Sequence, residues 1–222
     1  QLIYVRVEDA NTTCYDTTTL ELQVEQAPTA FTPTPLEYCD PDSDGFGEFM
    51  LTDADGQITG GAAGLVVTYH ETMSDAENNV NALTSPYDNI VVNTQTIYVR
   101  VENKDTQCVN DDFTFDVIVN PLPEFTVTSP QIVCLSGPDL TIFVENPAAV
   151  YDYVWTDPSG NDSIGSQITI SSGGLYTVTA TTTNGTGCTR TREILVNESS
   201  VATITDADVT IVDDSDNNSI TI

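Results

Sequence analysis

Short runs of alternating apolar and polar residues extend along almost the whole chain. Alternation over four to eight residues, rich in Val, Ile, Thr, Tyr and Phe, predicts a strand with one buried face. Clusters of Gly, Pro, Asn, Asp and Ser separate the runs and favour turns. The apolar positions are Ile3/Val5/Val7, Leu20/Leu22/Val24, Ile97/Val99/Val101, Phe113/Phe115/Val117/Val119, Ile168/Ile170, Tyr176/Val178/Ala180 and Ile194/Val196. Because helical periodicity is nearly absent, the sequence predicts an all-β fold of antiparallel β-sandwiches.

A stretch near the start of the chain recurs later, at an offset of 94 residues (97 − 3). Residues 3–8, Ile-Tyr-Val-Arg-Val-Glu, return unchanged at 97–102, and the same offset carries Cys14 onto Cys108. With one inserted residue, Leu20, Leu22, Val24 and Pro28 fall on Phe115, Val117, Val119 and Pro123. This period matches one immunoglobulin-like sandwich of about 100 residues. We therefore expect tandem immunoglobulin-like modules.

The repeat divides the chain into four expected segments. Residues 1–27 would be the last strands of a preceding module, 28–121 a complete module, 122–198 a third module and 199–222 the start of another. Pro121-Leu122-Pro123 predicts a short, stiff linker, because prolines fix φ and remove backbone donors. Since Gln1 is followed at once by a strand pattern, we expect the chain to be a piece of a longer protein.

Charge narrows the range of partners. The 222 residues include 34 Asp and Glu against 5 Lys and Arg, which gives a formal net charge of −29. Nucleic acid and anionic membrane surfaces carry the same sign, so they are excluded as direct partners. Divalent cations are favoured instead. No apolar stretch approaches the roughly 18–20 residues of a membrane span, so we expect no direct membrane insertion.

The five cysteines recur at two positions of the repeat. Cys39 and Cys134 lie early in a module, whereas Cys14, Cys108 and Cys188 follow the penultimate strand. Without a Cys-x-x-Cys spacing, zinc binding is not expected. Repetition favours one disulfide per module, Cys39–Cys108 and Cys134–Cys188, with Cys14 left over. The pairing Cys14–Cys39 with Cys108–Cys134 stays open. Either set of disulfides implies an oxidising, extracellular setting.

An acidic loop follows Cys39. Asp40, Asp42 and Asp44 stand at alternate positions before Gly45, a pattern in which carboxylates converge on one Ca²⁺. Glu48 is at the ninth position, where a calcium loop often has a water-mediated ligand. The bidentate Glu of position twelve is missing, so we expect weaker binding than in a cytosolic sensor. An exposed acidic turn without a cation is the other reading.

Two further groups of side chains bear on function. Tyr151, Tyr153 and Trp155 alternate on one face of a strand, which if exposed would make a platform for sugar rings. Burial against an opposite sheet is the commoner outcome for such residues. The single His70 ends a strand pattern and is expected at the surface. With no Gly-x-Ser-x-Gly motif nearby, we expect no enzymatic activity and no cofactor other than calcium.

The segment Tyr38-Cys39-Asp40-Pro41-Asp42-Ser43-Asp44-Gly45-Phe46, with Phe49 and Leu51-Thr52, resembles a repeat of large secreted surface proteins of Bacteroidetes. So does Ile97-Tyr98-Val99-Arg100-Val101-Glu102 followed by Cys108. These proteins are gliding-motility-associated adhesins exported by type IX secretion. The third module is similar to their polycystic-kidney-disease-like or immunoglobulin-like repeats.

The resemblance implies a structural or adhesive segment of a cell-surface protein, in the form of an extended stalk stiffened by disulfides and calcium. Its partners would be neighbouring modules of the same chain, surface glycans or other cell-surface proteins. Two alternatives stay open: an extracellular polysaccharide-binding module, and a subunit of an extracellular filament in which a neighbour's strand completes a module.

Overall fold

The structure is a computed structural model that describes residues 1–201, 205, 209–212 and 219–221. The chain divides into two compact units: the first unit is Gln1–Val119 and the second unit is Asn120–Ile222. Strands dominate both units, and the fold is all-β with immunoglobulin-like sandwiches, as the alternating pattern predicts. The finer division into four segments stays a prediction.

The first unit begins with an antiparallel hairpin of β1 (Leu2–Glu8) and β2 (Tyr15–Glu21). Both predicted strands form, although β2 ends at Glu21, before Leu22 and Val24. Every residue of the two strands is exposed, including the apolar positions. The hairpin therefore adds nothing to the core of the first unit.

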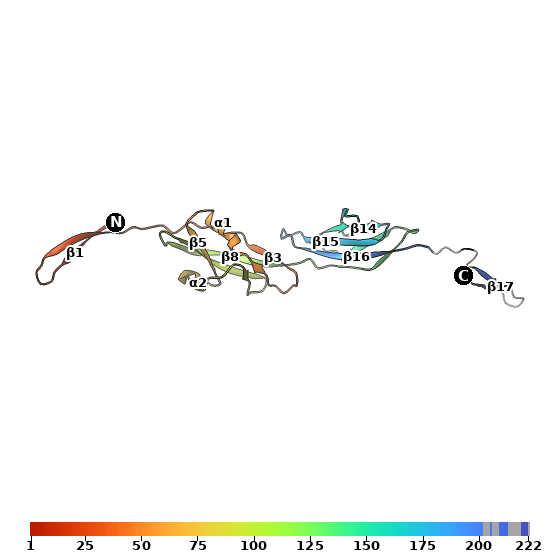
Figure 1. The fold of residues 1–222 in the computed structure, drawn as a ribbon, viewed down its shortest axis with the longest axis horizontal. Coiled ribbons are helices and arrows are strands. Elements are labelled where there is room, and N and C mark those ends of the chain that lie inside the picture. The colour runs from red at the N-terminus through yellow and green to blue at the C-terminus, as the bar shows by residue number, and fades with distance from the viewer. Residues whose placement is uncertain (202–204, 206–208, 213–218, 222) are drawn as a thin grey trace. The chain divides into compact units, whose positions relative to one another are not determined.

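A four-stranded sheet carries the core of the first unit (Figure 1). Its order is β3 (Leu36–Asp40), β8 (Val109–Pro121), β7 (Thr94–Asn103) and β5 (Leu65–His70). A short pair, β4 (Glu48–Phe49) with β6 (Tyr87–Asp88), completes the strands. The predicted alternation of β7 and β8 faces the core through Ile97, Val99, Val101, Phe115, Val117 and Val119, all of them buried.

Three short helical segments depart from the predicted absence of helix. They are η1 (Leu51–Ala54), α1 (Asp55–Thr59) and α2 (Met73–Asn78). Figure 1 shows α1 and α2 on either side of the sheet. From η1 and α1, Leu51, Ala54 and Ile58 enter the core. A segment this short has too few turns to show an apolar period, so the sequence pattern did not reveal it.

The helix α2 covers the sheet face opposite the core. In β7, Arg100 lies between core residues Val99 and Val101 and so faces the other way. Its guanidinium donates to the carbonyl oxygens of Ala76 and Glu77, at 3.2 and 3.4 Å, near the end of α2. In this part of the first unit, the sheet therefore has the hydrophobic core on one face and α2 on the other.

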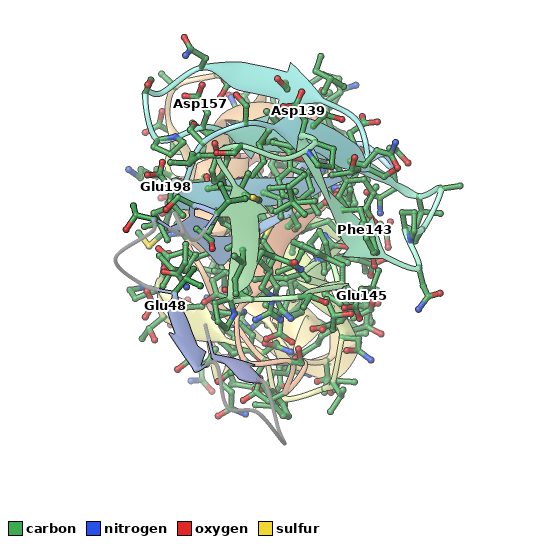
Figure 2. The ribbon with its side chains drawn as sticks, turned by 90° about the vertical axis from the view of Figure 1, so that its right-hand side faces the viewer. Glu48, Asp139, Phe143, Glu145, Asp157 and Glu198 are labelled. Atoms are coloured by element: carbon green, nitrogen blue, oxygen red, sulfur yellow. The ribbon has the colours of Figure 1, made fainter. Side chains whose placement is uncertain are left out.

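The second unit is a two-sheet sandwich. One sheet has the order β10 (Gln131–Cys134), β16 (Thr189–Ser199), β15 (Gly174–Thr182), β12 (Tyr151–Thr156) and β13 (Asp162–Ile164). The other has β14 (Gln167–Ile170), β11 (Leu140–Glu145) and β9 (Thr126–Val127). Ile142 and Val144 of β11 are buried between the sheets, whereas Phe143 on its outer face is 52% exposed (Figure 2).

Two features of the second unit matter for the cysteines. The strand β10 runs parallel to β16, with Cys134 opposite Ser199. The strands β15 and β16 are antiparallel and joined by a hairpin loop that contains Asn184-Gly185-Thr186-Gly187. Beyond Ser199, β17 (Thr210–Val212) pairs with β18 (Ser219–Thr221). Much of the segment 199–222 lies outside the described residues.

Candidate functional site: bonded cysteines and an acidic loop

The oxidation states of the cysteines differ from the predicted ones. Cys39 and Cys188 are disulfide-bonded, whereas Cys14, Cys108 and Cys134 are free thiols. The pairs Cys39–Cys108 and Cys134–Cys188 are therefore wrong, because each would include a free thiol. The rival pairs Cys14–Cys39 and Cys108–Cys134 are wrong for the same reason.

Strand direction explains why a disulfide within the second unit does not form. Cys134 lies opposite Ser199, the last residue of β16, while Cys188 comes just before Thr189, the first residue. At about 3.3 Å per residue, the length of β16 separates the two cysteines by roughly 35 Å. Disulfides need Cα atoms within about 7 Å. Cys134 and Cys188 thus occupy opposite ends of the sandwich.

The acidic loop forms in the structure as a compact turn directly after Cys39. Carboxylate oxygens of Asp40, Asp42 and Asp44 lie within 4.8 Å of one another. Asp40 is buried and the other two are exposed. An ion with ligands at 2.3–2.6 Å could touch all three, since oxygens on opposite sides of it would be about 5 Å apart. Glu48, labelled in Figure 2, lies outside this group and pairs with Asp88 in β4–β6.

Asp40 holds the loop together through backbone hydrogen bonds. Its Oδ1 accepts from the N–H groups of Asp42 and Ser43, at 3.2 and 2.7 Å, and its Oδ2 accepts from Gly45 at 2.9 Å. Gly45 has φ of +81°, a left-handed conformation that glycine adopts without strain. Hydrogen bonds to Asp40 therefore fix the shape of the loop. The sequence pattern did not reveal this structural role of Asp40.

Asp40 and Asp42 have opposite pKa shifts. Burial alone would raise the pKa of Asp40, but hydrogen bonds from the backbone N–H groups of Gly45 and Ser43 outweigh it, and the pKa is lowered. The pKa of Asp42 is raised, because its side chain hydrogen-bonds Asp40 and the charge of Asp44 is close. A bound cation would relieve this repulsion, which is the chemical case for calcium here.

The aromatic residues of β12 form no exposed platform. Trp155 is fully buried and Tyr153 is 5% exposed, and both belong to the core of the second unit. Tyr151 is half-buried and packs against that core. The indole N–H of Trp155 donates to the carbonyl oxygen of Gly165 at 2.9 Å, inside the unit. The burial expected as the commoner outcome is therefore found for Trp155 and Tyr153, and the sugar-binding role of the three residues, which required an exposed face, is wrong because that face holds the two sheets together.

His70 is fully buried, contrary to the expected surface position. Its Nδ1 lies 2.8 Å from the carbonyl oxygen of Val80, so this nitrogen carries a proton and donates it. Its Nε2 lies 3.0 Å from the Thr68 hydroxyl. Since Tyr69 faces the core, the neighbouring His70 faces the side that α2 covers. Both ring nitrogens are thus engaged in structural hydrogen bonds. The expectation of no enzymatic activity stays a prediction.

Within the described residues, no helix is both long and apolar enough to cross a membrane.

Comparison with known proteins gives one family match. A family model described as the Flavobacterium inter-domain disulphide bond domain matches residues 35–123, which is less than half of the chain. The matched segment begins just before Cys39 and includes the acidic loop, β7 and β8. The genus in this description, Flavobacterium, agrees with the resemblance to proteins of Bacteroidetes. No curated protein matches the chain.

Comparison with solved structures gives matches of low similarity, and some of these structures contain immunoglobulin domains. Dpr11 IG1 bound to DIP-gamma is 9% identical with a TM-score of 0.29, covering 60% of this chain and 83% of that chain. DIP-gamma IG1+IG2 is 11% identical with a TM-score of 0.28, covering 78% and 98%. A SusE-like surface located polysaccharide binding protein from Bacteroides thetaiotaomicron is 16% identical with a TM-score of 0.31, covering 67% and 31%.

Proposed function

We propose that this chain is a structural segment of an extracellular surface protein, in which a disulfide between Cys39 and Cys188 joins one immunoglobulin-like module to the next. The observation that carries the proposal is the position of the two bonded cysteines, since one belongs to each compact unit. The description of the matched family, an inter-domain disulfide domain, supports it.

Elimination supports the pairing of Cys39 with Cys188. The chain has five cysteines, and three of them are free thiols. Cys39 and Cys188 are the remaining two, and both are bonded.

The position of Cys188 within its module also supports the pairing of Cys39 with Cys188. Cys188 lies in the hairpin loop at the end of its sandwich opposite the exit of the chain at Ser199, so it is at the end where the chain enters the second unit.

A disulfide at this point would change the mechanics of the chain. Although its prolines stiffen the segment around Pro121-Leu122-Pro123, two modules joined only by this single strand of chain can still rotate about the bonds that the prolines do not fix. A second covalent connection removes much of this freedom. Force applied along the chain is then shared between the peptide linker and the bridge. Such a segment acts as a stiffened stalk that holds a binding or anchoring part away from the surface.

Composition and redox chemistry agree with a cell-surface setting. Disulfides persist in oxidising compartments, and the net charge of −29 keeps an extended array soluble and limits adhesion between modules. Export by type IX secretion, a role in gliding motility and adhesion to a substratum remain part of this proposal on the resemblance of residues 38–52 and 97–108 alone.

Calcium is a second component of the proposal. The three carboxylates follow Cys39 directly, so an ion bound by Asp40, Asp42 and Asp44 would stiffen the loop beside the bridge. Calcium would then strengthen the joint without being needed for the fold, because Asp40 already holds the loop. Titration calorimetry of the chain with CaCl₂, against Asp42→Asn and Asp44→Asn, tests this. Equal heats for all three proteins would contradict it.

Cutting the peptide linker tests the bridge directly. A protease recognition sequence inserted between Pro121 and Leu122 allows the backbone to be cleaved between the units. If Cys39 and Cys188 bond to each other, the cleaved chain stays one species on a non-reducing gel and separates into two with reductant. The variant Cys188→Ser should separate without reductant, whereas Cys108→Ser should stay joined.

Peptide mapping of the unaltered chain, alkylated and digested without reduction, gives the same answer independently. The expected product is a linked peptide pair that carries Cys39 and Cys188. Two fragments on the non-reducing gel, or alkylated Cys39 and Cys188 in the map, would overturn the proposed function.

A further inference from the structure

Two of the free cysteines lie in hairpin loops of the same construction. In the loop between β1 and β2, the backbone N–H of Asp9 donates to the carbonyl oxygen of Cys14 at 2.9 Å. Between β7 and β8, Asn103 donates in the same way to Cys108 at 3.0 Å. The side-chain oxygens of Asp9 and Asn103 each accept from two backbone N–H groups of their loop. The two loops thus present their cysteines alike.

The loop that holds the bonded Cys188 has the same plan. Thr182, at the end of β15, donates to the carbonyl oxygen of Cys188 at 3.0 Å. In all three loops the residue before the cysteine is left-handed, with φ of +58° at Thr13, +58° at Gln107 and +70° at Gly187. Cys188 shows what this position does in the protein, since it is the one of the three that has a disulfide partner.

The other two cysteines, Cys39 and Cys134, each lie in an edge strand of their own unit. Cys39 is in β3, which lies beside β8, the strand that follows the cysteine loop of the first unit. Cys134 is in β10, which lies beside the corresponding strand β16 of the second unit. Cys134 is opposite Ser199, at the end where the chain leaves the sandwich. A cysteine at the edge-strand position also forms a disulfide in this protein, because Cys39 is bonded.

We propose that each of the three free thiols forms a disulfide of the same kind with a cysteine of another module. The rule, which rests on the proposed bond between Cys39 and Cys188, is that an edge-strand cysteine bonds a hairpin-loop cysteine of the next module. Cys134 would then accept the loop cysteine of a module that follows it. Cys14 and Cys108 would each accept the edge-strand cysteine of a module that precedes theirs. Every module interface of such an array carries one bridge, always with the same polarity.

The polarity follows from the ends of the sandwich. In the second unit, Cys134 lies at the exit and Cys188 at the other end of β16, so the two cannot bond each other, because the length of the strand separates them. Such a module can bond one neighbour at each end. Loop-to-loop or edge-to-edge bonds would require two modules to meet with equivalent ends, which a head-to-tail chain does not do.

Bond formation needs an electron acceptor. Two thiols become one disulfide by losing two protons and two electrons, and a small-molecule disulfide such as oxidised glutathione takes these up and leaves as two thiols. The first thiolate attacks the small disulfide and releases one thiol. The second thiolate then attacks the mixed disulfide and releases the other.

Oxidation of the whole chain in a glutathione buffer tests the rule. The purified chain, already bonded at Cys39 and Cys188, is incubated at high concentration, alkylated and digested without reduction, and linked peptides from different molecules are quantified. The edge-to-loop class contains Cys134 with Cys14 or Cys108, and the loop-to-loop class contains only Cys14 and Cys108. Random pairing of three equally reactive thiols gives these two classes in equal amounts.

The rule predicts that the edge-to-loop class exceeds the loop-to-loop class about tenfold, because a complementary contact raises the effective concentration of the correct thiols. Cys134→Ser should remove the favoured class and not increase the other. Cys14→Ser and Cys108→Ser should each leave the remaining loop cysteine linked to Cys134. Equal amounts of the two classes, an excess of loop-to-loop links or no linked product would overturn the rule. The same digest reports the Cys39–Cys188 pair separately, so failure of the proposed function is distinguishable.

Discussion

The hairpins β1–β2 and β7–β8 share a six-residue sequence and a loop design, but only β7–β8 is buried. Ile97 is fully buried in the first unit, whereas the equivalent Ile3 is 37% exposed. Both hairpins nevertheless form with antiparallel pairing. Local alternation and loop residues are therefore enough to specify the hairpin, while burial depends on the remaining strands of a module. Equivalent positions in the two hairpins offer matched pairs for measurement.

The largest difference is expected at the buried isoleucine. Ile97→Ala removes side-chain contacts from the core of the first unit and leaves a cavity, so the free energy of unfolding should fall by about 2–5 kcal/mol. Ile3→Ala is the matched control, and it should change this free energy by no more than about 0.5 kcal/mol. Urea unfolding followed by circular dichroism measures both. Equal losses would show that β1–β2 is buried in solution.

The cysteines extend the comparison to the loops. Cys188→Ser should lower the free energy of unfolding of the oxidised chain by about 2–4 kcal/mol, because a bond that closes a long loop restricts the unfolded chain. Cys39→Ser should cost the same, and the double variant no more than either single one. In the equivalent loop, Cys14→Ser should have almost no effect. Additive losses from Cys39→Ser and Cys188→Ser would show that the two cysteines do not share a bond.

Equivalent arginines in the two hairpins differ in burial and in the contacts that they make. Arg100 and Arg6 both lie two residues before a glutamate that they contact, Glu102 at 3.2 Å and Glu8 at 2.9 Å. The Arg100 side chain is 12% exposed and also binds carbonyl oxygens of α2, whereas that of Arg6 is 54% exposed.

Arg100→Ala should lower the free energy of unfolding by about 1.5–3 kcal/mol through lost charged hydrogen bonds. Arg6→Ala should lower it by no more than about 0.5 kcal/mol, since exposed ion pairs contribute little. Thermal unfolding of the two variants provides the measurement. A loss at Arg6 as large as that at Arg100 would contradict the assigned burial.

These pairs show how far sequence reasoning reaches. Alternation specified the strands β7 and β15 because period two is a local property. It did not reveal α2, although Thr72 and Asp75 form a cap in which the Thr72 hydroxyl accepts from the Asp75 N–H. A search for a Ser or Thr followed three residues later by an acidic residue would have found that signal. Burial of His70 follows from α2, so missing the helix also misplaced the histidine.

The disulfide pairing was not predictable from the repeat alone. Counting showed that Cys39 and Cys134 are equivalent, and likewise Cys108 and Cys188. The pairing depends on which end of the module each position occupies. That in turn depends on β10 running parallel to β16, which the pattern of apolar residues does not encode. Likewise, the alternation of Tyr153 and Trp155 gave a shared face, and only the opposite sheet showed that this face is buried.

The smallest effect is expected where the two units differ in the turn after the edge-strand cysteine. Cys39 is followed by the acidic loop, and Cys134 by Leu135-Ser136-Gly137, which has no acidic residue. The pKa of Asp42 is raised in the folded state, mainly by its hydrogen bond with Asp40 and by the charge of Asp44. The folded chain therefore binds more protons than the unfolded chain between the ordinary pKa of Asp42 and the raised one. Stability from this group falls as the pH rises through that range.

Asp42→Asn removes the repulsion without changing the shape of the side chain. At neutral pH the melting temperature of the variant should be slightly above that of the natural chain, and the difference should vanish at a pH where Asp42 is protonated. Asp40→Asn should act in the opposite direction, because the lowered pKa of Asp40 stabilises the fold above its ordinary pKa and this stabilisation is lost as the pH falls through the folded pKa. Thermal unfolding between acidic and neutral pH, in a chelator and then in calcium, separates the contributions. If calcium raises the melting temperature of the natural chain to that of Asp42→Asn at neutral pH, the bound ion has offset the repulsion between the carboxylates. If Asp42→Asn instead lowers the melting temperature in the chelator, repulsion between the carboxylates does not destabilise the loop.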